Sequence, residues 1–386
     1  MSQHETNHEG RQMNRRAFLK GAASLASVSA LTPLVARAAD IFASSDTDAG
    51  TSSKVEDATH VVTDIAGREV TLPAVIKRAA VMVHPSFETV IMLGAWDQVI
   101  LTGNKMDQSG WGKVICPEYS KIQAVENATD PNLEEFAEKG VDVVFFWDSY
   151  PEIAKKFADL DIPMVVTQVA DSGVENWEQF VTFKKHEVTS VAETFGGKAV
   201  ERAQKWCDWV DATAKKITDK TSQLSTDQIP SVYYVRGPEA TTAHGGVSNT
   251  RWLVDMAGGD LVTKDVNQTM FDTTMEQIIE WNPAYIFMGR VDNKELVTED
   301  PNFAGVQAVQ DGNIFVNMKG MGPTDYCTDC FLMMEQIAQD LHPDLFTDLD
   351  MVREVKDYYP DFYDYTLSDD DAERILTFRG PASEDK

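Results

Sequence analysis

Residues 132–149 read NLEEFAEKGVDVVFFWDS, and residues 274–290 read TMEQIIEWNPAYIFMGR. In each stretch a helical pattern with an early glutamate, Glu134 or Glu276, is followed by a short stop and then by apolar residues that lead into a polar loop. Apolar runs without polar alternation are typical of strands covered on both faces of a parallel sheet. The recurrence of this helix–strand unit predicts two similar α/β lobes.

The same alternation surrounds both units. In the first half it predicts a hairpin over 61–73, strands over 78–83, 98–103 and 162–168, and helices over 84–95 and 151–161. In the second half it predicts strands over 231–237, 284–290 and 313–320, and helices over 248–259 and 331–341. Between the halves, residues 198–224 predict one helix of more than twenty residues, which would suit a strut joining the lobes.

We therefore expect an α/β fold: two lobes with parallel central sheets, joined by one long bridging α-helix. A ligand cleft is expected where the strand-end loops of the lobes face each other. The predicted divisions are a signal peptide over 1–38, a flexible leader over 39–58, a first lobe over 59–175, a linker with the bridging helix over 176–228 and a second lobe over 229–386.

The N-terminus carries an export pattern. Arg15 and Arg16 precede a weakly apolar, Ala/Ser-rich run, and residues 36–38 form an A-x-A cleavage site. This order resembles a twin-arginine export signal. No cysteine stands directly after the cleavage site, so we expect a soluble periplasmic protein without a lipid anchor.

The charge balance narrows the range of partners. The chain has 62 acidic and 34 basic residues, a formal net charge of −28. Removal of residues 1–38 takes away five basic and two acidic residues and makes the charge −31. So acidic a protein is a poor partner for nucleic acid or for an anionic membrane surface.

Catalytic signatures are absent from the sequence, which contains no G-x-S-x-G, H-E-x-x-H, P-loop or dinucleotide-binding glycine motif. We therefore expect a protein that is not an enzyme. One alternative is an exported metal-cluster redox protein, for which the four cysteines Cys116, Cys207, Cys327 and Cys330 are few. Another is a binding protein for a bare oxyanion or metal ion.

An ordered set of segments carries a family resemblance. They are VTDIAGREVTLP (62–73), VIMLGAWDQV (90–99), NLEEFAEKGVDVVF (132–145), VYYVRG (232–237), NTRWLVDMAGGDLV (249–262), MEQIIEWNPAYIF (275–287) and HPDLFTDLDMVREVKDYYPDFYDY (342–365). The set, which covers residues 61–376, resembles the substrate-binding proteins of ABC importers for iron–siderophore complexes, haem and cobalamin.

The resemblance implies two lobes with a small hinge motion and a ligand held in the cleft. It also implies a monomer without an intrinsic cofactor, which delivers an iron or cobalt chelate to an ABC permease and its ATPase. Glu118 and Glu276 match by position the acidic residues that dock on permease arginines, although exposed glutamates are common and Glu276 could simply favour a helix start.

Side chains on the strand-end loops are the candidate ligand contacts. A partly apolar chelate needs aromatic walls and a few polar anchors, and cations such as Arg236, Arg290 and Lys319 could pair with its carboxylates or catecholates. The predicted set is His84, Ser86, Phe87, Lys105, Trp111, Trp147, Tyr150, Arg236, His244, Arg290, Lys319 and Tyr326. His84 or His244 could also coordinate the metal directly, but a loop histidine is more often a hydrogen-bonding residue.

The stretch TDYCTDC (324–330) contains a C-x-x-C. A helix start would lower the pKa of the first thiol, as in redox motifs. However, no thioredoxin-like context surrounds the pair, and no second C-x-x-C completes a zinc site. In an oxidising compartment we expect a local disulfide between Cys327 and Cys330, then two unpaired residues, and a metal or redox role last.

Overall fold

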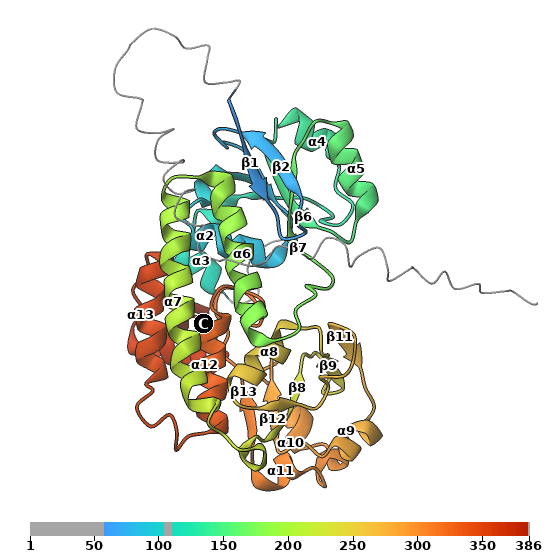
Figure 1. Cartoon of the computed structure of the whole chain (residues 1–386), viewed down its shortest axis with the longest axis vertical. Helices are drawn as coiled ribbons and strands as arrows, with labels where there is room; N and C mark the ends of the chain where they lie inside the picture. The colour runs from blue at the N-terminus through green and yellow to red at the C-terminus, as the bar shows by residue number, and fades with distance from the viewer. Residues whose placement is uncertain (1–57, 104–109, 385–386) are drawn as a thin grey trace, which may run out of the picture. The chain divides into compact units, whose positions relative to one another are not determined.

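Two β-sheets with helices packed around them organise the computed structural model, which describes residues 58–103 and 110–384 (Figure 1). Residues 56–386 form one compact unit. The predicted signal peptide, nearly all of the predicted leader and Lys105 lie outside the described residues. Within the part that the structure describes, no helix combines the length and apolarity needed to cross a membrane.

The first sheet is parallel and has the order β5-β4-β3-β6-β7. Its strands are β3 (Ala79–Val81), β4 (Val99–Thr102), β5 (Gln123–Ala124), β6 (Val143–Trp147) and β7 (Met164–Gln168). They lie between α2 (His84–Met92), α3 (Trp111–Ile115), α4 (Leu133–Glu138) and α5 (Pro151–Asp159). The antiparallel hairpin of β1 (Thr59–Thr63) and β2 (Glu69–Pro73) confirms the predicted one.

The second sheet is mixed, with the order β11-β9-β8-β12-β13 and β10 paired to β8. Its strands are β8 (Ser231–Val235), β9 (Thr242–His244), β10 (Asp260–Leu261), β11 (Met270–Asp272), β12 (Tyr285–Met288) and β13 (Ile314–Val316). The predicted parallel pairing holds for β8, β10, β12 and β13. However, β9 pairs antiparallel with both β8 and β11, and a tight turn closed by Thr242 N–H donating to Glu239 O reverses the chain between β8 and β9.

The helices of the second lobe are short and follow its strands. They are α8 (Asn249–Met256), α9 (Met275–Trp281), α10 (Glu295–Thr298) and α11 (Gln307–Asp311). The units α4–β6 and α9–β12 confirm the repeat with which the two lobes were predicted.

The bridging element is a helical hairpin. α6 (Trp177–Phe195) and α7 (Lys198–Thr221) pack along each other, joined by Gly196 and Gly197, which both have positive φ. α7 has 24 residues and is about 36 Å long, which confirms the predicted strut. Near one end Arg202 Nε donates to Met92 O in the first lobe at 2.6 Å, and at the other end Thr221 Oγ1 donates to Met256 O in the second at 2.8 Å.

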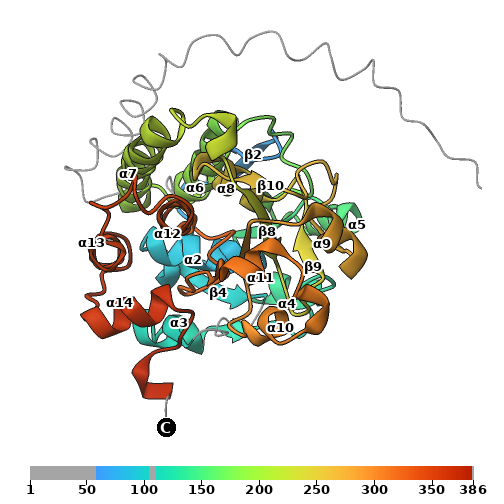
Figure 2. The same cartoon turned by 90° about the horizontal axis from the view of Figure 1, so that it is seen from below.

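The C-terminal helices contact elements of both lobes. α12 (Cys330–Leu341), α13 (Met351–Tyr363) and α14 (Asp369–Leu376) were expected within the second lobe. α12 packs on α8 of the second lobe and on α7, whereas α13 packs on α12, α14 and the first-lobe helix α2 (Figure 2). The apolar face of α13 carries Tyr358 against Trp209 of α7, with ring centroids 4.7 Å apart, so the chain returns to both lobes before it ends.

Glu88 of α2 ties three distant segments together. Its buried carboxylate accepts hydrogen bonds from Thr328 N–H at 2.8 Å, from the Thr328 hydroxyl and from the Tyr363 hydroxyl. Burial raises the pKa of Glu88, and these donors partly oppose the rise. Because a buried carboxylate must be hydrogen-bonded, the pattern fixes α2, α13 and the segment before α12 in one arrangement.

A second buried acid makes the packing of α12 against α7 dependent on pH. Burial raises the pKa of Glu335 from 4.5 to about 7, although the ion pair with Lys216 opposes the rise. Protonation then favours the folded state, so this stabilisation is complete below pH 4.5 and is lost as the pH rises through about 7. We predict that the wild type loses up to about 3 kcal/mol of unfolding free energy over this range relative to Glu335→Gln.

Urea unfolding of both proteins at several pH values measures the difference. Glu354→Gln, which removes the other carboxylate beside Lys216 at 3.1 Å, is the control and should keep most of the wild-type pH dependence, because Glu354 makes the smallest contribution to the raised pKa of Glu335. Parallel curves for the wild type and Glu335→Gln would contradict the prediction.

Candidate functional site

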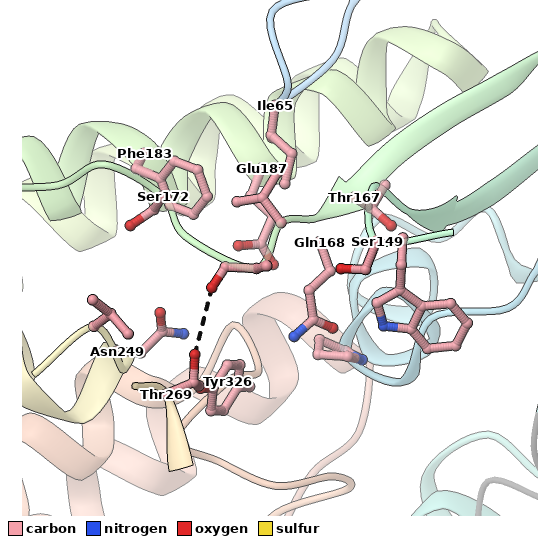
Figure 3. Close-up of a pocket in the computed structure, with 15 residues that line it drawn as sticks. Ile65, Ser149, Thr167, Gln168, Ser172, Phe183, Glu187, Asn249, Thr269 and Tyr326 are labelled. Carbon is pink, nitrogen blue, oxygen red and sulfur yellow. Dashed lines mark hydrogen bonds between the residues drawn. The ribbon is translucent and has the colours of Figure 1, made fainter. Parts of the chain in front are cut away.

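A cavity of about 160 Å³ lies where the ends of β6 and β7 face the second lobe (Figure 3). Parallel strands present their carboxyl ends at one edge of the sheet, which explains why polar loops meet there. Hydroxyl, amide and aromatic groups form most of the wall. It includes Trp147, Ser149, Thr167 and Gln168 from the first lobe, Phe183 and Glu187 from α6, and Asn249, Thr269 and Tyr326 from the second lobe.

Two helices begin at this wall, where Pro85 of α2 and Asn249 of α8 line the cavity. The residues before them, Val83 and Ser248, make no side-chain capping hydrogen bond. The first N–H groups of a helix lack partners within the helix, and together with the helix dipole they favour negative charge. The helix starts therefore give the cavity two positively polarised edges.

Helix α6 carries the ion pair Lys184–Glu187, of which the glutamate faces the cavity. Glu187 lines the cavity, whereas Lys184 is only 1% exposed. Lys184 Nζ donates to Glu187 Oε2 and to Tyr326 O, both at 3.0 Å. Burial raises the pKa of Glu187, and Lys184 opposes that rise. Lys184 thus joins α6 to the second lobe while neutralising the carboxylate.

The cationic anchors expected from the sequence are engaged elsewhere. Arg290 holds the buried carboxylate of Asp325 through Nε at 3.0–3.1 Å and Nη2 at 2.9 Å, and its guanidinium lies 5.2 Å from the ring centre of Tyr326. Arg236 donates to Gly237 O at 3.0 Å. Lys319 and Arg290 line a second cavity of about 50 Å³, where Lys319 Nζ stands 4.4 Å above Phe378.

Both candidate histidines are uncharged at neutral pH. Burial lowers the pKa of His244 to about 4, and Nδ1 lies 2.8 Å from Thr250 Oγ1 while the ring stacks on Tyr234. Burial and then Arg290 lower the pKa of His84. Over residues 58–103 and 110–384, no group of three His, Cys, Asp or Glu side chains is placed to hold a metal ion.

Other predicted contacts lie at varying distances from the cavity. Trp147 and Tyr326 line it, and Ser86 stands behind its wall, donating to Thr167 Oγ1 at 2.7 Å. Tyr150 lies beside Trp147, with centroids 5.9 Å apart, and is 36% exposed. Direct contact of these four side chains with a ligand stays a prediction.

Two predicted contacts are corrected. Phe87 and Trp111 are fully buried in the core, so neither side chain is available to a ligand. The indole of Trp111 donates to Arg379 O at 3.0 Å near the C-terminus of the chain. Both residues were selected because they follow a predicted strand, where ligand contacts are expected. They lie in the first turns of α2 and α3 instead, and the C-terminal segment covers Trp111.

The proposed docking acids are exposed on separate lobes. Glu118 pairs with Lys121 at 2.7 Å, and Glu276 stands in the first turn of α9. Their accessibility is compatible with docking, which stays a prediction.

The predicted disulfide is also corrected, because all four cysteines are free and buried. Cys327 lies in a turn in which its N–H donates to Pro323 O, whereas Cys330 opens α12. Burial raises the pKa of both thiols, opposite to the lowering that a reactive C-x-x-C requires.

The sequence interpretation missed Gln168, Glu187, Asn249 and Thr269. Gln168 ends a predicted strand and could have been found by the same rule that selected Trp147. Glu187 lies in the middle of a helix rich in charged residues, where no local signal distinguishes an inward-facing glutamate from an exposed one. Thr269 depends on the unpredicted strand β11.

Comparisons with known proteins agree with this architecture. The periplasmic binding protein family profile matches residues 81–318. The molybdate-binding protein MolA of Haemophilus influenzae is 25% identical over 335 residues, which cover 82% of this chain and 94% of that protein. Its molybdate-bound structure superposes with a TM-score of 0.70 at 23% identity, covering 80% of this chain and 99% of that chain.

Two further structures share the fold at lower identity. Helicobacter pylori CeuE in complex with Ni-His has a TM-score of 0.65 at 18% identity, over 83% of this chain and 99% of that chain. A Saccharomonospora viridis protein of an Fe³⁺-hydroxamate transport system has a TM-score of 0.54 at 17% identity, over 72% of this chain and 98% of that chain.

The state of the cysteines can be tested by thiol labelling. We predict that the native protein reacts slowly, because all four thiols are buried, and that denaturation without reductant exposes four reactive thiols per chain. Mass spectrometry after alkylation counts them. If only two thiols were labelled before reduction and all four after it, the predicted disulfide would be correct.

The Arg290–Asp325 pair predicts a large loss of stability on truncation. Arg290→Ala leaves the carboxylate of Asp325 buried and unpaired, so we expect unfolding free energy to fall by about 3–5 kcal/mol. Chemical denaturation measures the loss. Arg251→Ala, which removes a looser contact to Asp255 at 3.8 Å, is the control and should cost about 1 kcal/mol or less.

Proposed function

This chain belongs to the periplasmic binding protein family, and we propose that it captures a small oxyanion, or a similarly compact anionic metal species, and delivers it to an ABC permease and its ATPase. The cavity between the lobes carries the proposal. Its hydroxyl and amide wall supplies hydrogen bonds, and the two helix starts supply positive polarisation, while none of the described residues that line the cavity is a lysine or an arginine.

The volume of the cavity favours a small ligand. Sites for drug-sized molecules occupy about 300–1,000 Å³, whereas this cavity has about 160 Å³. Haem, a corrinoid or a ferric siderophore would require the lobes to separate widely. The similarity to MolA, whose structure holds molybdate, also supports an oxyanion as the ligand.

Delivery requires a permease surface and export. We propose that Glu118 and Glu276, one exposed on each lobe, orient the protein on arginines of the permease. The N-terminal sequence supports export through the twin-arginine pathway.

An iron or cobalt chelate is the second candidate. Trp147 and the partly exposed Tyr150 form an aromatic pair at the edge of the cavity, and such a surface suits a planar or partly apolar ligand. Under this candidate the aromatic pair, rather than the hydroxyl wall, would provide most of the contact.

A thermal-shift panel separates the candidates. We predict that molybdate, tungstate or another oxyanion raises the melting temperature, because a ligand at 100 times its Kd stabilises the folded state by about 2.7 kcal/mol. Ferric hydroxamate, Ni-histidine, haemin and cyanocobalamin form the second arm. A rise with these chelates alone would favour the second candidate, and no rise with either set would contradict both.

Filling the cavity is the structural control. Ser149→Trp should abolish the ligand-induced rise, because Ser149 lines the cavity. Thr182→Trp, on the exposed face of α6, should retain it. Equal responses of the two variants would place the ligand elsewhere.

A further inference from the structure

Glu187 presents an acid where an anion is expected to bind. Its side chain is 12% exposed and lines the cavity, and Figure 3 shows it extending from α6 toward the residues of both lobes. Lys184 Nζ engages Oε2 at 3.0 Å. No described residue donates a hydrogen bond to Oε1, which leaves this oxygen for a ligand.

The surroundings of Glu187 contain little compensating positive charge. Lys184 is held behind the cavity wall, where it also bonds Tyr326 O and lies near the buried acids Glu88 and Asp329. From the second lobe, Tyr326 and Cys330 face Glu187, and both are neutral because burial raises the pKa of each. Among the described residues that line the cavity, those from the first-lobe strands and from α8 have uncharged side chains, such as Gln168 and Asn249.

An oxyanion oxygen in contact with an ionised carboxylate oxygen would be repelled, and the largely buried position of Glu187 screens this repulsion less than bulk water would. A single proton between the two oxygens turns the contact into a charge-assisted hydrogen bond. The proton can arrive on the ligand, or Glu187 can take it from solvent as the anion binds. No covalent bond between heavy atoms forms or breaks.

We propose that Glu187 couples oxyanion capture to one proton and thereby selects oxyanions that carry or accept a proton over weakly basic ones such as sulfate. This inference rests on the proposed function. Burial already raises the pKa of the Glu187 carboxyl, so the free protein is poised for the uptake.

Isothermal titration calorimetry with molybdate provides the test. Because the wild type must protonate Glu187, its affinity should weaken as the pH rises above the pKa of the free carboxyl, approaching about tenfold per pH unit where about one proton is taken up per anion. Repeating the titration in buffers of different ionisation enthalpy counts the proton. Sulfate should bind at least about tenfold more weakly than molybdate, a difference of about 1.4 kcal/mol.

Three variants isolate the carboxyl group. Glu187→Gln keeps an acceptor for Lys184 and a permanent donor for the anion, so it should bind independently of pH, take up no proton and discriminate less against sulfate. Glu187→Asp keeps a titrating group and should retain the pH slope. Glu193→Gln, on the same helix but not lining the cavity, should behave as the wild type.

The outcomes distinguish this inference from the proposed function. Molybdate binding with no pH dependence in the wild type, or with the same slope in Glu187→Gln, would overturn the role of Glu187 and leave oxyanion capture standing. If no oxyanion binds at any pH, both fail. Circular dichroism and melting temperature confirm that each variant is folded.

Discussion

The buried carboxylate of Glu88 is the constraint on which the rest of the arrangement depends. It accepts from the backbone and hydroxyl of Thr328, 240 residues away, and from the hydroxyl of Tyr363, 275 residues away. None of these groups could stay buried alone without a large desolvation cost, so the first lobe, the segment before α12 and helix α13 must come together as a set. Tyr326, two residues before Thr328, is thereby positioned in the cavity wall.

Several buried acidic side chains near Glu88 surround a single lysine, Lys184. Asp329 is fully buried with neither carboxylate oxygen hydrogen-bonded, and burial raises its pKa well above the ordinary value. Lys184 is the buried lysine near both Asp329 and Glu88, and it is also bonded to Glu187. The cavity is consequently connected by charge to the packing of the lobes, rather than being an independent surface depression.

Local patterns predicted most of the secondary structure and the two lobes. The apolar runs of β6 and β12 and the length of α7 are properties of contiguous residues, so the sequence displays them directly. The amphipathic pattern of α13 indicates that one face of the helix is buried, but it does not identify the element against which that face packs. For this reason its return to α2 was not predicted, and neither was the burial of Trp111 beneath the C-terminal segment.

The site was predicted less well, for an electrostatic reason. Strand-end position selected Trp147, which the structure places in the cavity wall together with Tyr326. The sequence pattern could not show that Arg290 is paired with Asp325, because the two residues are 35 positions apart and meet only in the folded chain. Nor could it show that the cavity wall carries a glutamate in place of the expected cations.

The contact at the mouth of the cavity has a consequence for ionic strength. Thr269 Oγ1 donates to Ala170 O across the lobes at 3.5 Å, a bond between uncharged groups (Figure 3). At 0.1 M, dissolved salt largely screens exposed charges that are more than about 10 Å apart, so it relieves the self-repulsion of a chain with net charge −28 but hardly affects this bond. The free energy of unfolding should therefore rise with salt concentration, while the free energy needed to break the Thr269–Ala170 hydrogen bond should stay the same.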